Sequence, residues 1–345
     1  MTEDEIIAGV RLCRPDGSLD PAAVGWTRAP LHDTSGIGRG RRGRDKRWEY
    51  WGIITPTHVV GVTTAALDYA ALHQVYVLER STGIETDEVV VAPLSGTVEL
   101  PATLGQGRVR SRTRRVEIAV DDADEGADGP SGTPGTRLRA RTADVELDVV
   151  VDRPDGHEVL GVVVPWSPRR FQYTLKDVGR PVRGTLRVDG VLHEIGAPAW
   201  AVLDHGRGRW PYSVAWQWGV GNGSVRDASG RDRRLGLQLG GTWTRHGPTT
   251  ENALFVDGRL DKVHDELEWS FDRHAYLRPW RVRGERLDLS FAPFFDRVSR
   301  TNLGVVASAT DQCFGSWSGW VRTDAGERLD VHRIEGWAED VRQRW

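Results

Sequence analysis

Trp48-Glu-Tyr-Trp-Gly-Ile-Ile-Thr55, Gln74-Val-Tyr-Val-Leu-Glu79 and Arg286-Leu-Asp-Leu-Ser-Phe291 carry the pattern that decides the fold. Apolar and polar side chains alternate in these short segments, which is typical of a strand with one packed and one solvated face. The same alternation runs through residues 109–120 and 139–149. Because strands that are wet on one face belong to antiparallel sheets, the sequence predicts an almost entirely β protein.

Turn signals separate these strands at hairpin spacing. Asp189-Gly190 and Asp257-Gly258 lie between alternating runs, as primed two-residue turns require, and Asp155-Gly156 and Arg283-Gly284 occupy similar places. Helical patterning is scarce. Residues 64–72 and 337–345 are the two candidate helices, and each could also be strand or coil.

The length and the strand count predict two packed units. The chain has 345 residues, more than a single hydrophobic core usually holds. About eight strands precede Pro165 and about eight follow it, which suits two antiparallel barrels or strongly curved sheets. We expect an N-terminal extension over residues 1–46, a first β domain over 47–165 and a second over 166–345. The acidic, Gly- and Pro-rich stretch 121–135 is expected to be a flexible hairpin tip.

Composition limits the partners and the compartment. A net charge of -3 provides no general attraction for nucleic acid, and the arginine-rich runs 39–47 and 108–115 are expected to be solvated surface rather than phosphate sites. Cys13 and Cys313 are expected to be reduced thiols. The acidic N-terminus and the lack of any apolar run near the roughly 18 residues of a membrane span predict a cytoplasmic protein without a membrane span.

Asp204 and His205 are the candidate catalytic residues. They lie in the stretch that is densest in polar and aromatic side chains, between Trp166 and Asn222. A carboxylate and an imidazole among tryptophans can serve as general acid and base, because an apolar wall raises a carboxyl pKa and lowers a histidine pKa. In the structural alternative, Asp204-His205-Gly206 is a turn and the neighbouring tryptophans are core residues.

Seven further residues are candidates for ligand contact. They are Tyr173, Lys176, Trp200, Trp216, Trp218, Asn222 and Asn252. Lys176 is one of three lysines and could form a Schiff base or change its charge if buried, or it could be a surface residue near a turn. Glu251-Asn252 could be a pocket pair or a hairpin entrance. No phosphate-binding loop or zinc-protease motif occurs and the histidines are scattered, so no cofactor and no metal are predicted.

Several segments resemble known families. Trp48-Glu-Tyr-Trp-Gly52, Phe171-Gln-Tyr-Thr-Leu-Lys176, Leu289-Ser-Phe-Ala-Pro-Phe-Phe-Asp-Arg297 and the C-terminal segment from Gly336 together resemble the bacterial domain of unknown function 2804. Trp200 with Asp204-His205-Gly206 is similar to the second half of the hydroxyneurosporene synthase and AttH-like group. That similarity implies two lipocalin-like barrels and a relation to hydratases of isoprenoid chains and to pericyclases, with Asp204 and His205 as the residues carried across.

Three functional hypotheses follow. In the first, a barrel pocket binds an apolar small molecule such as a lipid, isoprenoid or polyketide, and Asp204 protonates an alkene while His205 orients it and the tryptophan faces stabilise positive charge. Such an enzyme would be a hydratase (a lyase) or an isomerase. In the second, the pocket belongs to a carrier without activity. In the third, tryptophans on an exposed sheet face bind a glycan. The sequence leaves the oligomeric state open.

Overall fold

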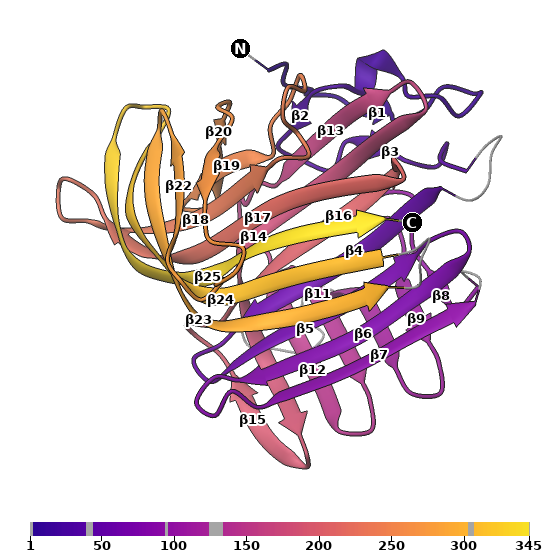
Figure 1. The fold of residues 1–345 in the computed structure, drawn as a ribbon, viewed down its shortest axis with the longest axis horizontal. Coiled ribbons are helices and arrows are strands. Elements are labelled where there is room, and N and C mark those ends of the chain that lie inside the picture. The colour runs from indigo at the N-terminus through magenta and orange to yellow at the C-terminus, as the bar shows by residue number, and fades with distance from the viewer. Residues whose placement is uncertain (1–2, 39–43, 94–95, 124–133, 303–306, 345) are drawn as a thin grey trace.

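The computed structural model describes residues 3–38, 44–93, 96–123, 134–302 and 307–344. Within these ranges the only helix is the three-residue 3-10 turn η1 (Pro21–Ala23). Two large, strongly curved antiparallel sheets form the rest and pack against each other (Figure 1). The predicted all-β class and the packing of two curved sheets are therefore confirmed.

The first sheet has fourteen strands and runs from the N-terminal third of the chain to Arg209. Its strands are β2 (Trp26–Thr27), β4 (Asp45–Ile54), β5 (His58–Ala66), β6 (Ala70–Glu79), β7 (Glu85–Pro93), β8 (Val98–Glu99), β9 (Val109–Arg112), β10 (Glu117–Ala123), β11 (Gly135–Arg141), β12 (Val145–Asp152), β13 (Leu160–Ser167), β14 (Arg170–Val188), β15 (Val191–Ile195) and β16 (Trp200–Arg209). A parallel pair, β1 (Val10–Arg11) and β3 (His32–Asp33), precedes it.

The second sheet has nine strands in the order β20-β19-β18-β17-β25-β24-β23-β22-β21. They are β17 (Ser213–Arg226), β18 (Asp232–Gly241), β19 (Asn252–Val256), β20 (Arg259–Val263), β21 (Glu268–Ser270), β22 (Trp280–Gly284), β23 (Leu287–Asn302), β24 (Ala307–Arg322) and β25 (Arg328–Arg344). The C-terminal strands β23 to β25 lie beside β4 to β7 of the first sheet, although they are far from them in sequence (Figure 1).

The two sheets divide between Arg209 and Ser213, later than the position near Pro165 that strand counting suggested. The reason is that β16 pairs along its whole length with β4, so this late strand belongs to the first sheet. The N-terminal segment packs on β13 and β14 through buried Leu12, Leu19 and Ile37.

Strand β14 connects the two halves of the first sheet. Its first half pairs with β13 and β16, and its second half pairs with β12 and β15. Between these halves the register shifts at Gly179, whose φ of 83° lies in the region that favours glycine. A bulge of this kind bends a strand, and the first sheet folds back over its own apolar core.

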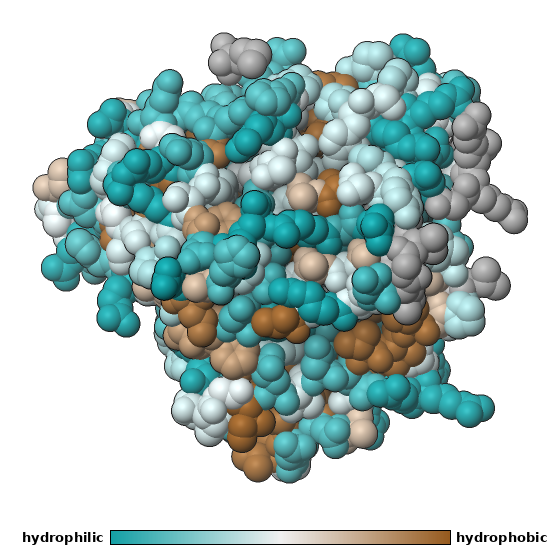
Figure 2. Space-filling model, in the orientation of Figure 1, coloured by the Kyte–Doolittle hydropathy of each residue, from teal (hydrophilic) through white to brown (hydrophobic). Residues whose placement is uncertain are grey.

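The strands β4, β5, β6, β14 and β16 form a layer with two packed faces. On one face, Trp51 and Leu203 belong to the core of the first sheet. On the other face, Trp200 meets Trp218 and Trp337 of the second sheet, and Trp200 and Trp337 are stacked at 6.2 Å. None of the described tryptophans is exposed, and the surface in Figure 2 is mainly hydrophilic with separate apolar patches.

The structure corrects some local predictions and confirms others. Both candidate helices are strands: residues 64–72 fall on the β5–β6 hairpin, and residues 337–344 fall in β25, which pairs on both sides. Asp204-His205-Gly206 lies within β16, so the turn interpretation is wrong. Asp189-Gly190 and Asp257-Gly258 have positive φ and join paired strands, as predicted. The predicted flexible tip 121–135 lies mostly outside the described residues.

The sequence also led to predictions about the environment of the arginine-rich runs and the state of the two cysteines. In β9, Val109 and Ser111 are buried while Arg112 is exposed, which confirms a strand with one basic, solvated face. Most of the run 39–47 lies outside the described residues. Cys13 and Cys313 are both free and buried, as expected for reduced thiols.

Candidate functional site

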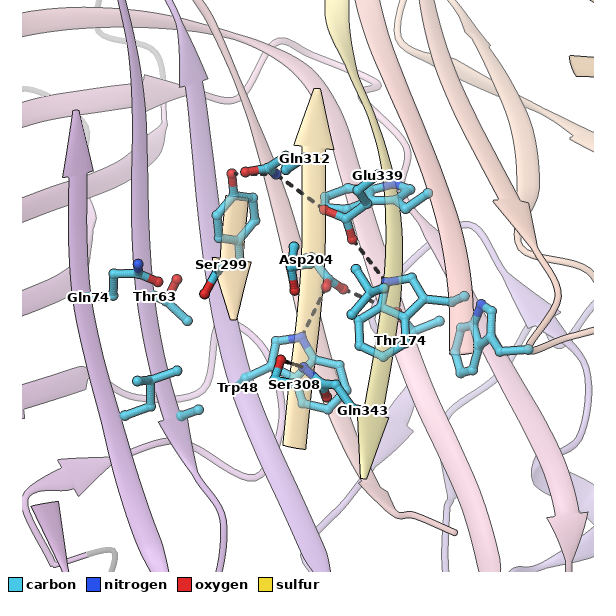
Figure 3. A pocket seen from close by; sticks show the side chains of 18 of the residues that line it. Trp48, Thr63, Gln74, Thr174, Asp204, Ser299, Ser308, Gln312, Glu339 and Gln343 are labelled. Atoms are coloured by element: carbon cyan, nitrogen blue, oxygen red, sulfur yellow. Dashed lines mark hydrogen bonds between the residues drawn. The ribbon is translucent and has the colours of Figure 1, made fainter. Parts of the chain in front are cut away.

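A cavity of about 290 Å³ lies between the two sheets (Figure 3). Tyr50 of the first sheet and Trp216 and Trp218 of the second belong both to its lining and to the aromatic layer between the sheets. The sequence led us to expect a pocket inside one barrel. This cavity instead needs both sheets, because the residues that line it come from β4, β5, β6, β14 and β16 on one side and from β17, β23, β24 and β25 on the other.

On the first sheet, strand register places three functional side chains in one row. Asp204 is the register partner of Lys176 on one side and of Tyr50 on the other. Partners in antiparallel strands project from the same face, so all three face the cavity. Since successive side chains alternate, His205 projects from the opposite face of β16.

Lys176 is a buried cation held by two carboxylates. Its Nζ lies 2.9 Å from Asp204 Oδ1, 3.3 Å from Glu251 Oε1 and 4.0 Å from the centre of the Trp218 ring. Burial opposes the charge, but the carboxylates of Asp204 and Glu251 outweigh it and raise the pKa of Lys176. The surface interpretation is therefore wrong. A protonated ammonium is also a poor nucleophile, so this environment does not favour a Schiff base.

Asp204 accepts two hydrogen bonds in addition to its ion pair with Lys176. The indole Nε1–H of Trp48 donates to Oδ2 at 3.0 Å, and the Thr174 hydroxyl donates to Oδ1 at 3.3 Å. Trp48 reaches this position by lying across Gly206, where an added Cβ would be only 2.0 Å from Trp48 Cζ2. Gly206 is therefore required for the indole to reach Asp204.

On the second sheet, a matching row holds Glu339. Trp218, Glu339, Gln312 and Arg297 are successive register partners across β17, β25, β24 and β23. Glu339 accepts from Trp216 Nε1 at 2.9 Å and from Gln312 Nε2 at 3.2 Å, and both donors are neutral. Burial raises the pKa of Glu339 to about 7, despite the Trp216 hydrogen bond and the positive charge of Lys176, which lower it.

Three carboxyl groups at the cavity, of which Glu251 and Glu339 are buried and Asp204 is half-buried, each accept a tryptophan N–H. Asp204 accepts from Trp48, Glu339 from Trp216, and Glu251 from Trp243 at 2.9 Å. Lys176 forms ion pairs with Asp204 and Glu251, and no ion pair of Glu339 occurs among the described residues. Burial also raises the pKa of Glu251, and repulsion from Asp204 adds to it although Lys176 opposes it. The cavity thus holds the Asp204 carboxylate beside Lys176, aromatic faces, and two buried carboxyl groups with raised pKa values, Glu251 and Glu339, of which Glu339 has a pKa of about 7.

The structure brings four of the nine predicted site residues to the cavity and places five elsewhere. Lys176, Asp204, Trp216 and Trp218 line it. His205 lies on the other side of the sheet, where its Nδ1 is 3.3 Å from Glu49 Oε1, and burial, followed by repulsion from Arg207, lowers its pKa to about 4. Tyr173 is on that same side, with its ring centre 6.1 Å from that of His205.

The remaining three predicted residues support or border other regions. Trp200 and Asn222 line a separate pocket of about 220 Å³. Asn252 accepts from the Gly240 backbone N–H at 2.7 Å and donates to the Asp265 carbonyl at 2.8 Å. It therefore anchors the chain next to Glu251, which is the member of the predicted Glu251-Asn252 pair that lines the cavity.

Sequence reasoning missed Trp48, Trp243, Gln312 and Glu339 as site residues. Glu339 lay in a segment considered as a helix. The usable signal was the alternation of Trp337, Glu339 and Val341, which places a glutamate on an otherwise apolar strand face.

No group of three or more His, Cys, Asp or Glu side chains in the described ranges is arranged to hold a metal ion. In the same part of the chain, no helix is long and apolar enough to cross a membrane.

The fold and the cavity define a class of all-β proteins in which two curved antiparallel sheets enclose a site of small-molecule size. Within that class the chain belongs to the family described as Domain of unknown function (DUF2804), whose sequence model matches residues 3–345. This confirms the predicted family.

Solved structures with related chain folds include three that match most of this chain. An AttH-like protein of Nitrosomonas europaea has a TM-score of 0.49 at 13% identity and covers 86% of this chain and 92% of its own. Kievitone hydratase of Nectria haematococca has a TM-score of 0.46 at 12% identity, covering 87% and 89%. CghA has a TM-score of 0.43 at 11% identity, covering 90% of each chain. No curated protein sequence matches the chain.

Proposed function

We propose that the cavity between the sheets binds a small, largely apolar molecule and that the chain catalyses proton transfer to it, as a hydratase or an isomerase. The observation that carries this proposal is the pairing of buried carboxyl groups with tryptophans at one cavity, with Glu339 as the member that has no ion pair among the described residues. Three carboxyl groups around Lys176 in an apolar site favour a proton on one of them.

Glu339 replaces Asp204 as the proposed proton donor. Asp204 contacts the Lys176 ammonium and two further donors, all of which stabilise a carboxylate charge. Glu339, with a pKa of about 7, carries a proton in a substantial fraction of molecules at neutral pH. His205 has no place in this mechanism, because its side chain is on the opposite face of β16.

The reaction balances without a cofactor. The Glu339 proton adds to one alkene carbon, the π electrons form the new C–H bond, and the other carbon becomes positive. The Asp204 carboxylate and the faces of the tryptophans stabilise that charge. Addition of water followed by loss of its proton to Glu339 yields an alcohol, whereas loss of a neighbouring carbon-bound proton to Glu339 yields an isomer.

A carrier without activity is the second candidate, because the same dry, aromatic cavity would retain a ligand without converting it. The glycan hypothesis requires an exposed aromatic platform, and the buried or half-buried positions of the described tryptophans do not support it.

The test is to purify the protein from its native host and to identify copurifying small molecules by mass spectrometry. The wild type is compared with Glu339→Gln, with Asp204→Asn, and with Ala65→Phe, which fills the cavity. Ala65→Phe should lose the ligand. A molecule retained by Glu339→Gln that differs from the wild-type molecule by one water, or by the position of a double bond, supports catalysis.

The same unaltered molecule in the wild type and in both charge variants would favour the carrier. Equal retention by Ala65→Phe would exclude this cavity as the site. Glu335→Gln is the matched control, since Glu335 lies on the same strand but its carboxylate is partly exposed and paired with Arg80 at the surface.

A further inference from the structure

The cavity has a second polar region that the proposed proton transfer does not use. Uncharged hydroxyl and amide side chains line the part of the cavity formed by β5, β6, β23, β24 and β25. We call it the neutral polar side, and it consists of Thr63, Gln74, Ser299, Ser308, Thr310 and Gln343. Five of the six are half-buried and Ser299 is exposed, so this side of the cavity reaches the solvent.

Strand register explains how these residues meet. Thr63 is the partner of Gln74, Ser299 of Thr310, and Ser308 of Gln343. Each pair projects from one sheet face, and the first pair faces the other two across the cavity. In Figure 3, Thr63 and Gln74 lie on the side of the cavity away from Glu339 and Thr174, with Ser299 next to them, while Ser308 and Gln343 lie beside Trp48.

Much of the hydrogen-bonding capacity on this side is unused within the protein. In the part of the chain that the structure describes, Gln343 Oε1 is buried without a partner, and its Nε2 makes one long contact, of 3.5 Å, to the Ser308 hydroxyl. Among the described residues, the hydroxyl groups of Thr63, Ser299 and Thr310 form no hydrogen bond. A buried acceptor without a partner is costly, so a ligand group that donates to it would be favoured.

The positive charge of Arg297, which lies beside the neutral polar side, already has partners within the protein. Arg297 is the nearest cation on the same strand face as Ser299, and its guanidinium lies 3.6 Å from Asp87 Oδ2 and 3.2 Å from Gln312 Oε1. A carboxylate or phosphate on the ligand would therefore find no free cation here, and an ammonium would find no free anion.

We propose that the neutral polar side is a subsite for a hydroxyl group, and that the ligands of this cavity are alcohols or phenols with an apolar body. The body lies among the tryptophans near Glu339, and the hydroxyl group points towards Thr63, Thr310 and Gln343. This inference rests on the proposed function for the location of the site, but it concerns binding and requires no turnover.

The test uses two matched probes, trans-stilbene and 4-hydroxystilbene, titrated against the protein with tryptophan fluorescence as the readout. The Glu339→Gln background excludes conversion during the titration. The variants are Thr63→Val and Thr310→Val, which remove a hydroxyl group at nearly constant volume. The control is Thr64→Val, because Thr64 is adjacent in β5 but buried on the opposite face of the sheet.

We expect 4-hydroxystilbene to bind more tightly than trans-stilbene. Because each valine variant removes one hydrogen bond, Thr63→Val or Thr310→Val should bind 4-hydroxystilbene about threefold to tenfold more weakly. The affinity for trans-stilbene, and both affinities in the Thr64→Val control, should be unchanged. Equal affinities for the two probes, equal losses for both in the valine variants, or no binding of either would overturn the subsite. If the mass-spectrometric comparison instead finds the same unaltered molecule in the wild type and in Glu339→Gln, catalysis is overturned. The preference of the cavity for a hydroxyl group would be unaffected by that result.

Discussion

Replacing Glu339 by glutamine should remove a large part of the pH dependence of stability. The folded-state pKa is about 7, against 4.5 for an ordinary glutamate. At about 1.4 kcal/mol per pH unit, this difference corresponds to about 3 kcal/mol of unfolding free energy. Because the folded chain binds the proton more tightly, this contribution is fully present below about pH 4.5 and is lost as the pH rises through 7.

Glu339→Gln resembles the protonated carboxyl group at every pH. We therefore expect the variant to be close to the wild type in stability at pH 5 and more stable than the wild type at pH 8, by up to about 3 kcal/mol. Because glutamine has one good acceptor fewer for Trp216 or Gln312, the unfolding free energy of the variant would fall by about 1 kcal/mol at both pH values. The difference between the two pH values is therefore the decisive quantity.

The assay is chemical unfolding at pH 5 and pH 8 at constant ionic strength, followed by tryptophan fluorescence. Glu335→Gln, four residues earlier in β25, should keep the wild-type dependence on pH. If Glu339→Gln and the wild type lose the same stability between pH 5 and pH 8, Glu339 does not carry a proton in the folded chain, and its role as the acid fails.

Three further outcomes are expected. Lys176→Met should cost about 3 kcal/mol, because it removes the cation from the half-buried Asp204 and the buried Glu251. A Lys176→Met/Asp204→Asn double variant should cost less than the sum of the single changes in unfolding experiments. Gly206→Ala should lower the thermal midpoint and alter the near-UV circular dichroism, since the new methyl group would occupy the place of the Trp48 indole ring. Gly196→Ala should change neither, because no atom lies within 4 Å of a Cβ added at Gly196. His205→Gln should lower stability but leave ligand retention unchanged; loss of the ligand from a stably folded His205→Gln variant would return this residue to the site.

Much of the candidate site was within reach of the sequence because it depends on local alternation. Trp216 and Trp218 lie two residues apart on one strand, so their common face followed directly from the period of two. The same rule, applied to Asp204 and His205, separates them once both are known to lie in a strand. Treating them as a pair depended on their adjacency in the sequence and on resemblance, whereas adjacent residues of β16 project from opposite faces.

Lys176 and Glu339 could not be placed from sequence. Their environments depend on which strands are neighbours, and β16 pairs with β4, more than 150 residues away, because both edges need hydrogen-bonding partners. No local sequence signal specifies which strands pair, because every alternating segment offers the same backbone hydrogen-bonding groups.

By itself, the sequence determined that the chain is an all-β protein of two curved sheets, and it resembled the DUF2804 family, to which the chain belongs. The fold class follows from side-chain periodicity, turn residues and composition, which act over a few residues, and the family follows from the resemblance of several segments. The tertiary structure alone decided that the cavity lies between the sheets, that Lys176 pairs with Asp204, and that Glu339 is buried beside neutral donors, where its pKa is raised. Those features arise from long-range strand register and from the removal of water around charged groups, and neither is encoded within a short stretch of the chain.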